Sequence, residues 1–227
     1  MITWRGDAPF DERYGDAFYA EDGLAEARHV YLGGCGLPGR FRPGFRIGET
    51  GFGTGLNLCA AWAAWRAARI PGPLRYDGFE AHPIAPADMA RALSAFPEIA
   101  GEASALHAAW AAADGPVRRL GLPGLDARVH LGDARRTVPA WDGEADAWFL
   151  DGFAPARNPA LWEPALLRAV AGRLAPGGRA ASFTAAGHVR RSLAGAGLAV
   201  ERRPGHGRKR HMSVAARPPL APARTSS

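Results

Sequence analysis

Short apolar runs alternate with longer stretches rich in alanine and leucine from residue 45 onwards. The short runs have strand length, and the longer stretches favour helices. The predicted strands are residues 45–51, 74–80, 127–131, 145–150, 179–184, 198–202 and 211–215. The predicted helices are residues 56–69, a segment opened by Pro86, and residues 98–113, 162–174 and 187–194. This alternation predicts an α/β fold with a doubly wound, mostly parallel, seven-stranded Rossmann-like sheet.

The two ends of the chain depart from this rhythm. The last two predicted strands are separated by too few residues for a crossover helix, so they form an antiparallel hairpin. Residues 1–44 place aromatic residues among charges and glycines, with a helical turn expected at 24–28 and a short strand at 29–32. We expect an N-terminal extension (1–44), either a flap or a roof over a site, then the main domain (45–217) and a disordered tail (218–227).

A glycine-rich turn lies between the first predicted strand and its helix. Its glycines, Gly51, Gly53 and Gly55, follow a G-x-G-x-G spacing rather than the G-x-G-x-x-G of dinucleotide-binding enzymes. Glu49 stands two residues before the first glycine, and a carboxylate there suits a cationic ligand better than a diphosphate. S-adenosylmethionine (SAM) meets that demand, although such a turn could also merely connect strand to helix. The candidate cofactor-binding residues of this segment are Glu49, Gly51, Phe52, Gly53, Thr54, Gly55 and Asn57.

Four acids fall at or beside the carboxyl ends of predicted strands, where open parallel sheets bind ligands. They are Glu49, Glu80, Asp133 and Asp151. Glu80 has the spacing from the glycines at which an acid reaches a ribose, and Asp133 is placed to meet an adenine amino group. Any one of them could be a solvated loop residue or a helix cap. Their convergence on one edge favours a binding site.

Asp151 begins a loop with two prolines that leads to Trp162. Methylation of an amine needs a neutral nitrogen lone pair, and a nearby carboxylate can hold the amine and accept its proton. We therefore predict Asp151 as the catalytic residue that also lies against the cofactor, with Phe153, Pro155 and Trp162 as walls of the substrate pocket. The alternative is that Asp151 caps the loop and Trp162 belongs to the core.

Composition narrows the class of protein. The chain has 227 residues, 47% of them hydrophobic, which is enough for one sizeable core. Its apolar runs are shorter than a membrane span, and its first residues lack a signal-peptide core. The two cysteines have no metal-like spacing, no metal-ligand cluster or Ser-His-Asp arrangement emerges, and we expect a cytoplasmic protein with reduced thiols.

The positive charge is concentrated near the C-terminus. The whole chain carries a net charge of +6, and residues 187–217 hold eight arginine or lysine residues against one glutamate. A localised basic face is the electrostatic signature of a polyanion partner such as RNA or DNA. An arginine-biased composition is the alternative, since Lys209 is the only lysine of the chain.

Several stretches together resemble one known family. They are residues 23–32, 49–57, 149–159, 182–191 and 205–212, including LDGFAPARNP and GHGRKRHM. The sequence is similar to the methyltransferase of the bacterial tRNA wobble-uridine pathway, which occurs alone or as the N-terminal half of a bifunctional protein. The resemblance implies SAM-dependent N-methylation of the 5-aminomethyl group of 2-thiouridine at tRNA position 34, giving 5-methylaminomethyl-2-thiouridine.

The resemblance also implies roles for individual residues. Glu49, the three glycines, Glu80 and Asp133 would hold SAM, and Asp151 would orient or deprotonate the amine. The residues that would face the tRNA are Arg190, Arg191, Arg208, Lys209 and Arg210. We expect no flavin domain in this chain, so another enzyme would supply the aminomethyl substrate.

Three other hypotheses stay open from the sequence. One is a SAM-dependent methyltransferase of another amine or RNA. A second is a nicotinamide-dependent oxidoreductase, which the glycine spacing disfavours. The third is a catalytically inactive RNA-binding module, which the basic hairpin alone could support.

Overall fold

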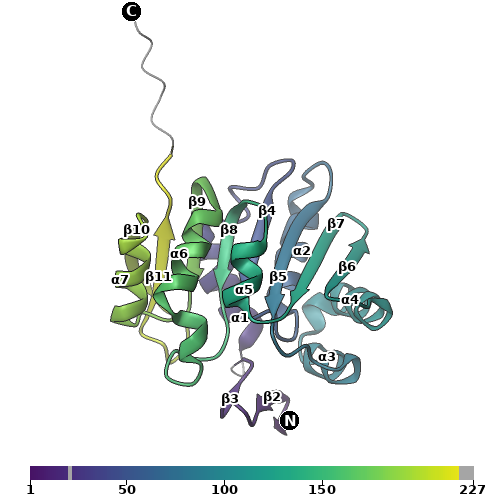
Figure 1. Ribbon diagram of the computed structural model, residues 1–227. Helices are drawn as coiled ribbons and strands as arrows, with labels where there is room; N and C mark the ends of the chain where they lie inside the picture. The colour runs from purple at the N-terminus through teal and green to yellow at the C-terminus, as the bar shows by residue number, and fades with distance from the viewer. Residues whose placement is uncertain (20–21, 220–227) are drawn as a thin grey trace, which may run out of the picture.

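The computed structural model describes residues 1–19 and 22–219. Its main sheet contains β4 (Arg46–Thr50), β5 (Leu74–Glu80), β6 (Val117–Leu122), β7 (Leu125–Leu131), β8 (Ala145–Leu150), β9 (Leu174–Ser182), β10 (Ala199–Pro204) and β11 (His211–Ala216). The spatial order of these strands is β10-β11-β9-β8-β4-β5-β7-β6 (Figure 1). The four central pairings, from β9 to β7, are parallel, and β11 and β10 close one edge as an antiparallel hairpin. The predicted fold class and hairpin are confirmed.

The prediction of seven strands is wrong by one. The eighth strand, β6, pairs antiparallel with β7 through a tight turn at Pro123 and Gly124, where Gly124 has a φ of +75°. Its sequence, VRRLGL, places two arginines side by side and a glycine before the last residue, which obscures the alternation typical of a strand.

Helices cover both faces of the sheet. One face packs against α2 (Leu56–Ala68), α3 (Pro86–Leu93), the short helix η2 (Pro97–Ile99) and α4 (Ala100–Ala112), whose side chains share one core cluster with Tyr76. The other face packs against α5 (Ala134–Ala140), α6 (Pro164–Arg173) and α7 (Gly187–Gly195), around Trp148. The sequence did not predict α5, because this helix is short and contains Pro139.

The N-terminal residues form two structures. A small antiparallel sheet of β1 (Ile2–Arg5), β2 (Ala8–Asp11) and β3 (Asp16–Ala17) lies beyond the carboxyl ends of the parallel strands (Figure 1). The helix α1 (Gly23–Glu26) continues into the π-helix η1 (Ala27–Gly33), so the predicted strand at 29–32 is wrong.

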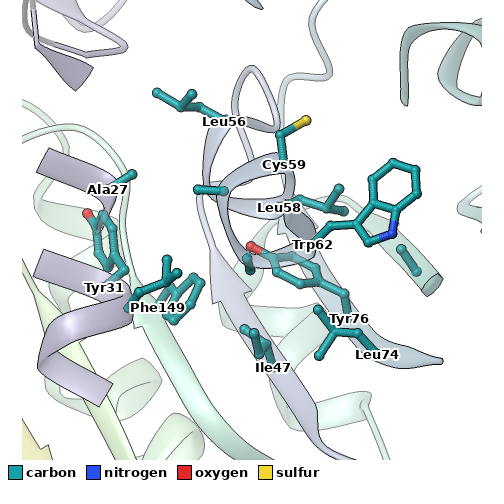
Figure 2. Close-up of a cluster of buried hydrophobic side chains, with 14 of the residues drawn as sticks. Ala27, Tyr31, Ile47, Leu56, Leu58, Cys59, Trp62, Leu74, Tyr76 and Phe149 are labelled. Carbon is teal, nitrogen blue, oxygen red and sulfur yellow. The ribbon is translucent and has the colours of Figure 1, made fainter. Parts of the chain in front are cut away.

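The error at 29–32 has a simple origin. The apolar run from Val30 to Leu32 is compatible with either structure, and packing decides between them. In η1, Ala27, Val30 and Tyr31 are buried, and the Tyr31 ring lies 5.4 Å from that of Phe149. Figure 2 shows Tyr31 and Tyr76 on either side of Phe149. The helix α1–η1 therefore shares the main core, and the domain division at residue 44 stays a prediction.

Within the described part of the chain, no helix is both long and apolar enough to cross a membrane. The predicted disordered tail lies outside the described residues from position 220 onwards.

Candidate active site

Three glycines shape the turn between β4 and α2. Gly51, Gly53 and Gly55 have φ angles of +74°, +54° and +79°, in the left-handed region that favours glycine. A Cβ atom on Gly51 would lie 2.7 Å from the Cα atom of Gly152. The absence of a side chain at position 51 thus lets the turn touch the backbone after β8, and this contact brings Asp151 beside the glycine turn.

Asn57, in the first turn of α2, connects two acids from different strands. Its Nδ2 atom donates hydrogen bonds of 2.7 Å to both Glu49 Oε1 and Asp151 Oδ2. The other oxygen of Glu49 accepts a 2.7 Å hydrogen bond from the Tyr76 hydroxyl. Glu49, Asn57 and Asp151 are together called the carboxylate network below. Burial, and then the nearby Asp151, raise the pKa of Glu49 well above its ordinary value.

Asp151 differs from Glu49 because it also faces a cavity. Burial raises the pKa of Asp151 to about 6, while hydrogen bonds from Tyr31, the Gly152 amide and Asn57 oppose that rise. The Gly152 amide donates to Oδ1 at 2.7 Å. A carboxylate with a pKa just below neutrality is mostly ionised at pH 7 and can still accept a proton, which suits a general base.

Glu80, at the end of β5, is fixed by backbone amides on both oxygens. Oε2 accepts a hydrogen bond of 2.8 Å from the Gly53 amide, and Oε1 accepts one of 2.7 Å from the His82 amide. Glu80 lines the cavity beside the glycine turn. Its remaining lone pairs are therefore available to hydroxyl groups of a ligand, as expected for a ribose-binding acid.

Asp133 has a different local role. Its side chain caps α5 by accepting a hydrogen bond from the Arg135 amide, and it also pairs with the Arg135 guanidinium at 2.6 Å. These bonds with Arg135 hold the pKa of Asp133 below its ordinary value. The neighbouring Ala134, rather than Asp133, lines the cavity. Contact between Asp133 and an adenine amino group stays a prediction.

A cavity of about 320 Å³ opens at the carboxyl edge of the sheet, within the size range of ligand sites. From the glycine motif, it is lined by Gly51, Phe52, Gly53, Thr54 and Asn57. Glu49 lies beneath Asn57 and does not line it, and neither does Gly55. The lining carboxylates are Asp11, Asp16, Glu26, Glu80 and Asp151. Such a wall suits a positively charged ligand.

Four residues that line the cavity were not indicated by the sequence: Asp11, Asp16, Glu26 and Tyr31. They come from the N-terminal extension, where no periodic pattern indicates which side chains point inward. Asp16 Oδ2 accepts a hydrogen bond of 3.1 Å from the Ala154 amide, and the ring of Phe18 packs over Gly53. The extension therefore covers the cavity, as the roof interpretation predicts.

The loop after Asp151 presents one aromatic side chain to the cavity. The Phe153 ring lies 4.7 Å from the Tyr14 ring and 5.2 Å from the Phe18 ring. Trp162 is buried in the core, and its indole nitrogen donates a 2.9 Å hydrogen bond to the Phe153 carbonyl. Neither Trp162 nor Pro155 lines the cavity, and Trp162 supports Phe153 from below. A role of either residue in binding the substrate stays a prediction.

The predicted RNA-facing residues divide into two groups. Arg191, Arg208 and Arg210 are exposed, and Arg190 is partly exposed with its Nε atom bonded to the Ala185 carbonyl. None of these arginines lines the cavity, but Lys209 does. The ammonium group of Lys209 pairs with Glu26 at 2.6 Å and lies 4.2 Å from the centre of the Phe183 ring. Lys209 therefore turns towards the cavity mouth, and contact of these five residues with RNA stays a prediction.

Within the described residues, no group of three or more histidine, cysteine, aspartate or glutamate side chains is arranged to hold a metal ion. The polar groups that line the cavity include its carboxylates, Asn57, His82 and Lys209.

Comparison with known proteins adds independent information. A family model described as S-adenosyl-L-methionine-dependent methyltransferase matches residues 97–218. The tRNA 5-methylaminomethyl-2-thiouridine biosynthesis bifunctional protein MnmC of Caulobacter vibrioides is 47% identical over 97% of this chain and 39% of its own length. The protein of the same name from Chromohalobacter salexigens is 43% identical over 93% of this chain and 32% of its own length. The chain thus spans two fifths or less of either relative.

Among solved structures, the crystal structure of MnmC2 from Aquifex aeolicus matches with a TM-score of 0.73 and 25% sequence identity. The match covers 97% of this chain and 72% of that one. The likeness therefore extends over both the sheet and the N-terminal segment that covers the cavity.

Proposed function

Because the chain belongs to the S-adenosyl-L-methionine-dependent methyltransferase family, we propose that it methylates the amine of 5-aminomethyl-2-thiouridine at tRNA position 34. The product is 5-methylaminomethyl-2-thiouridine. Membership of the family confirms the predicted cofactor and removes the nicotinamide alternative. The substrate is proposed from the names of the relatives together with the chemistry of the cavity.

The residues of the cavity fit SAM. The positive φ angles of the glycine turn let a ligand approach its backbone, and Glu80 offers carboxylate lone pairs to the ribose. The acidic wall complements the sulfonium and ammonium groups. When bound, SAM supplies an electrophilic methyl carbon on a positively charged sulfur, which leaves as a neutral thioether.

The single observation that supports amine methylation best is the position of Asp151. Its carboxylate faces the cavity beside the glycine turn, and its pKa of about 6 lets it hold an ammonium group and accept one of its protons. The amine nitrogen then has a lone pair with which to form the new bond to carbon. Asn57 and the Gly152 amide fix the orientation of the carboxylate during this transfer.

The basic residues support a nucleic-acid substrate. Arg191, Arg208 and Arg210 are exposed, on α7 and on the loop between β10 and β11. Phosphate groups bound there would place one nucleotide near the cavity mouth, where Phe153 is available to stack on a base. A methyltransferase of another amine or RNA is the second candidate, and the following experiment separates the two.

The test is mass spectrometry of wobble nucleosides. tRNA that carries the 5-aminomethyl group is incubated with the protein and SAM, digested and compared with a sample lacking SAM. We expect one added methyl group at the wobble uridine, and far slower addition with the Asp151→Asn variant. SAM binding without any methyl transfer to position 34 would refute the proposed substrate.

A further inference from the structure

The triplet Arg208-Lys209-Arg210 lies in the loop between β10 and β11, but its three side chains do not share one environment. Within residues 1–19 and 22–219, Lys209 is the one lysine or arginine that lines the cavity. It is also the only lysine in the whole sequence. Its two neighbours stay outside the cavity, whereas the Lys209 side chain, although partly exposed, reaches the cavity lining.

The backbone of the loop is folded to hold Lys209 in this position. The Lys209 amide donates to the His206 carbonyl at 3.0 Å, and the Gly205 amide donates to the Arg210 carbonyl at 3.1 Å. A Cβ atom at position 205 would overlap the carbonyl oxygen of Lys209, so glycine is required there. The loop therefore fixes where the lysine side chain begins.

The side chain is held at its far end as well. Glu26 Oε1 accepts from Nζ at 2.6 Å, and Phe183 presents its ring face to the ammonium group at 4.2 Å. Glu26 and Phe183 also line the cavity. Contacts with both an acid and an aromatic ring make this a defined position rather than a freely moving surface cation.

The geometry points to Lys209 as a positioning residue of the active site, whose ammonium group keeps Asp151 ionised and the substrate amine neutral. A cation favours a neighbouring carboxylate in its charged form and disfavours a second cation nearby. Both effects prepare the amine for methyl transfer, since the lone pair must be free. This inference rests on the proposed function and adds an electrostatic role to it.

The other groups that face Asp151 do not provide this charge. Asn57 and the Gly152 amide donate neutral hydrogen bonds, Tyr31 donates its hydroxyl, and Glu49 and Tyr76 add no positive charge. The charge of Lys209 also lowers the pKa of Asp151, though less than the hydrogen bonds from Tyr31, the Gly152 amide and Asn57 do. Around Lys209 itself, Glu26 is the direct partner, and Asp22 and Asp151 are the further acids that its charge influences.

The first experiment measures the rate of methyl transfer as a function of pH under single-turnover conditions, with saturating SAM and tRNA. In Lys209→Met we expect the acid limb of the profile to move to higher pH by about 0.5 unit, which lowers the rate at pH 5 about threefold and changes the rate at pH 7 little. Lys209→Arg keeps the charge and should restore the wild-type limb.

The adjacent arginines provide matched controls. Arg208→Met and Arg210→Met should raise KM for tRNA while leaving the acid limb in place, because these residues lie outside the cavity. If the wild type methylates tRNA but the acid limb of the Lys209→Met profile lies at the same pH as that of the wild type, this inference fails and the proposed function stands. If the wild type does not methylate tRNA, the proposed function itself fails.

A second measurement does not depend on turnover. Reductive methylation with ¹³C-formaldehyde labels Lys209 and the α-amino group, and Lys209→Arg identifies the lysine resonance. We expect the Lys209 methyl resonance of the unliganded protein to show an inflection near the pKa of Asp151, about 6, and to lose it in Asp151→Asn. An inflection that persists in Asp151→Asn, or is absent from the wild type, would overturn the proposed electrostatic contact.

Discussion

The carboxylate network is buried, whereas two contacts between the N-terminal segment and the β10–β11 loop, Asp22–His206 and Glu26–Lys209, are partly exposed. Glu49 has no exposed surface, and its partners are the neutral donors Asn57 and Tyr76. The pairs Asp22–His206 and Glu26–Lys209, called the rim pairs below, join polar side chains that are partly in water. The Asp22 side chain is 52% exposed and that of Lys209 is 43% exposed.

This difference in exposure to solvent determines how much each region contributes to stability. A buried carboxylate that loses its donor retains the full cost of its desolvation, whereas an exposed ion pair is replaced by water at little cost. We therefore expect the carboxylate network to control both folding and chemistry. The rim pairs should affect local charge and access to the cavity, with little effect on stability.

The largest expected effect follows from changing the acid that links the network to the cavity. Asp151→Asn preserves the size of the side chain but removes the proton acceptor, so kcat should fall by about 10²–10⁴-fold. Single-turnover methylation with saturating SAM measures this loss. Asp126→Asn, an exposed position on β7, serves as the control. A variant at position 151 that retains the wild-type rate would remove Asp151 from the mechanism.

The next largest effect is expected from removing the Asn57 side-chain amide, which bonds both Glu49 and Asp151. Asn57→Leu removes the donor to both Glu49 and Asp151, and we expect the free energy of unfolding to fall by about 2–4 kcal/mol. Urea unfolding at pH 7 measures this change. Asn158→Leu alters the only other asparagine and should cost less, since no side-chain hydrogen bond of Asn158 is found among the described residues. An equal fall in the free energy of unfolding in the two variants would show that the hydrogen bonds of Asn57 do not stabilise the protein.

The network should also make stability depend on pH. Because folding raises the pKa of Asp151 from 3.8 to about 6, the folded state favours the protonated acid, and this preference is lost as pH rises through 6. The stability of Asp151→Asn relative to wild type should therefore increase between about pH 4 and 6. The upper limit is about 3 kcal/mol, reduced where cavity water reaches the carboxylate. A relative stability that is constant with pH would contradict the shifted pKa.

A smaller effect tests the contact between the glycine turn and the Asp151 loop. Gly51→Ala places a Cβ atom against Gly152, whereas Gly44 has a similar φ of +77° and open space around its Cβ position. Gly44→Ala therefore reports the backbone strain alone. We expect Gly51→Ala to cost about 1–3 kcal/mol more than Gly44→Ala in thermal or urea unfolding. Equal costs would mean that the turn can move away from Gly152.

The sequence predicted the glycine turn and Asp151 better than it predicted the side chains at the cavity mouth. The strands β5 and β8 were predicted at their observed bounds, and the glycine motif and Asp151 are local features that depend on few distant residues. The bridge by Asn57 was not visible, because it joins side chains 94 positions apart in the chain. A short motif can therefore indicate a site without indicating the hydrogen bonds that hold it.

The cavity mouth was predicted less well for a physical reason. The direction of Lys209 depends on Glu26, 183 positions away, and on the loop geometry that Gly205 permits. Likewise, Asp16 faces the cavity through a bond with Ala154, across 138 positions. A count of basic residues indicates a charged region, but which side chain turns inward is decided by tertiary contacts.

The smallest expected effect concerns the rim pair Asp22–His206, whose atoms lie 2.5 Å apart. The hydrogen bond with His206 lowers the pKa of Asp22, so any stabilisation is present above the ordinary range of the acid and is lost as pH falls below about 4. A double-mutant cycle of Asp22→Asn and His206→Gln should give a coupling energy of less than about 1 kcal/mol, which salt weakens further.

The size of this coupling energy tests whether the rim pairs contribute less to stability than the buried carboxylate network does. A value above about 2 kcal/mol would resemble a buried interaction and would mean that the rim is part of the folded core. A value near zero would leave Asp22 and His206 free to separate at little cost. The β10–β11 loop would then be held weakly to the N-terminal segment at this point, while the carboxylate network keeps the geometry of Asp151 unchanged.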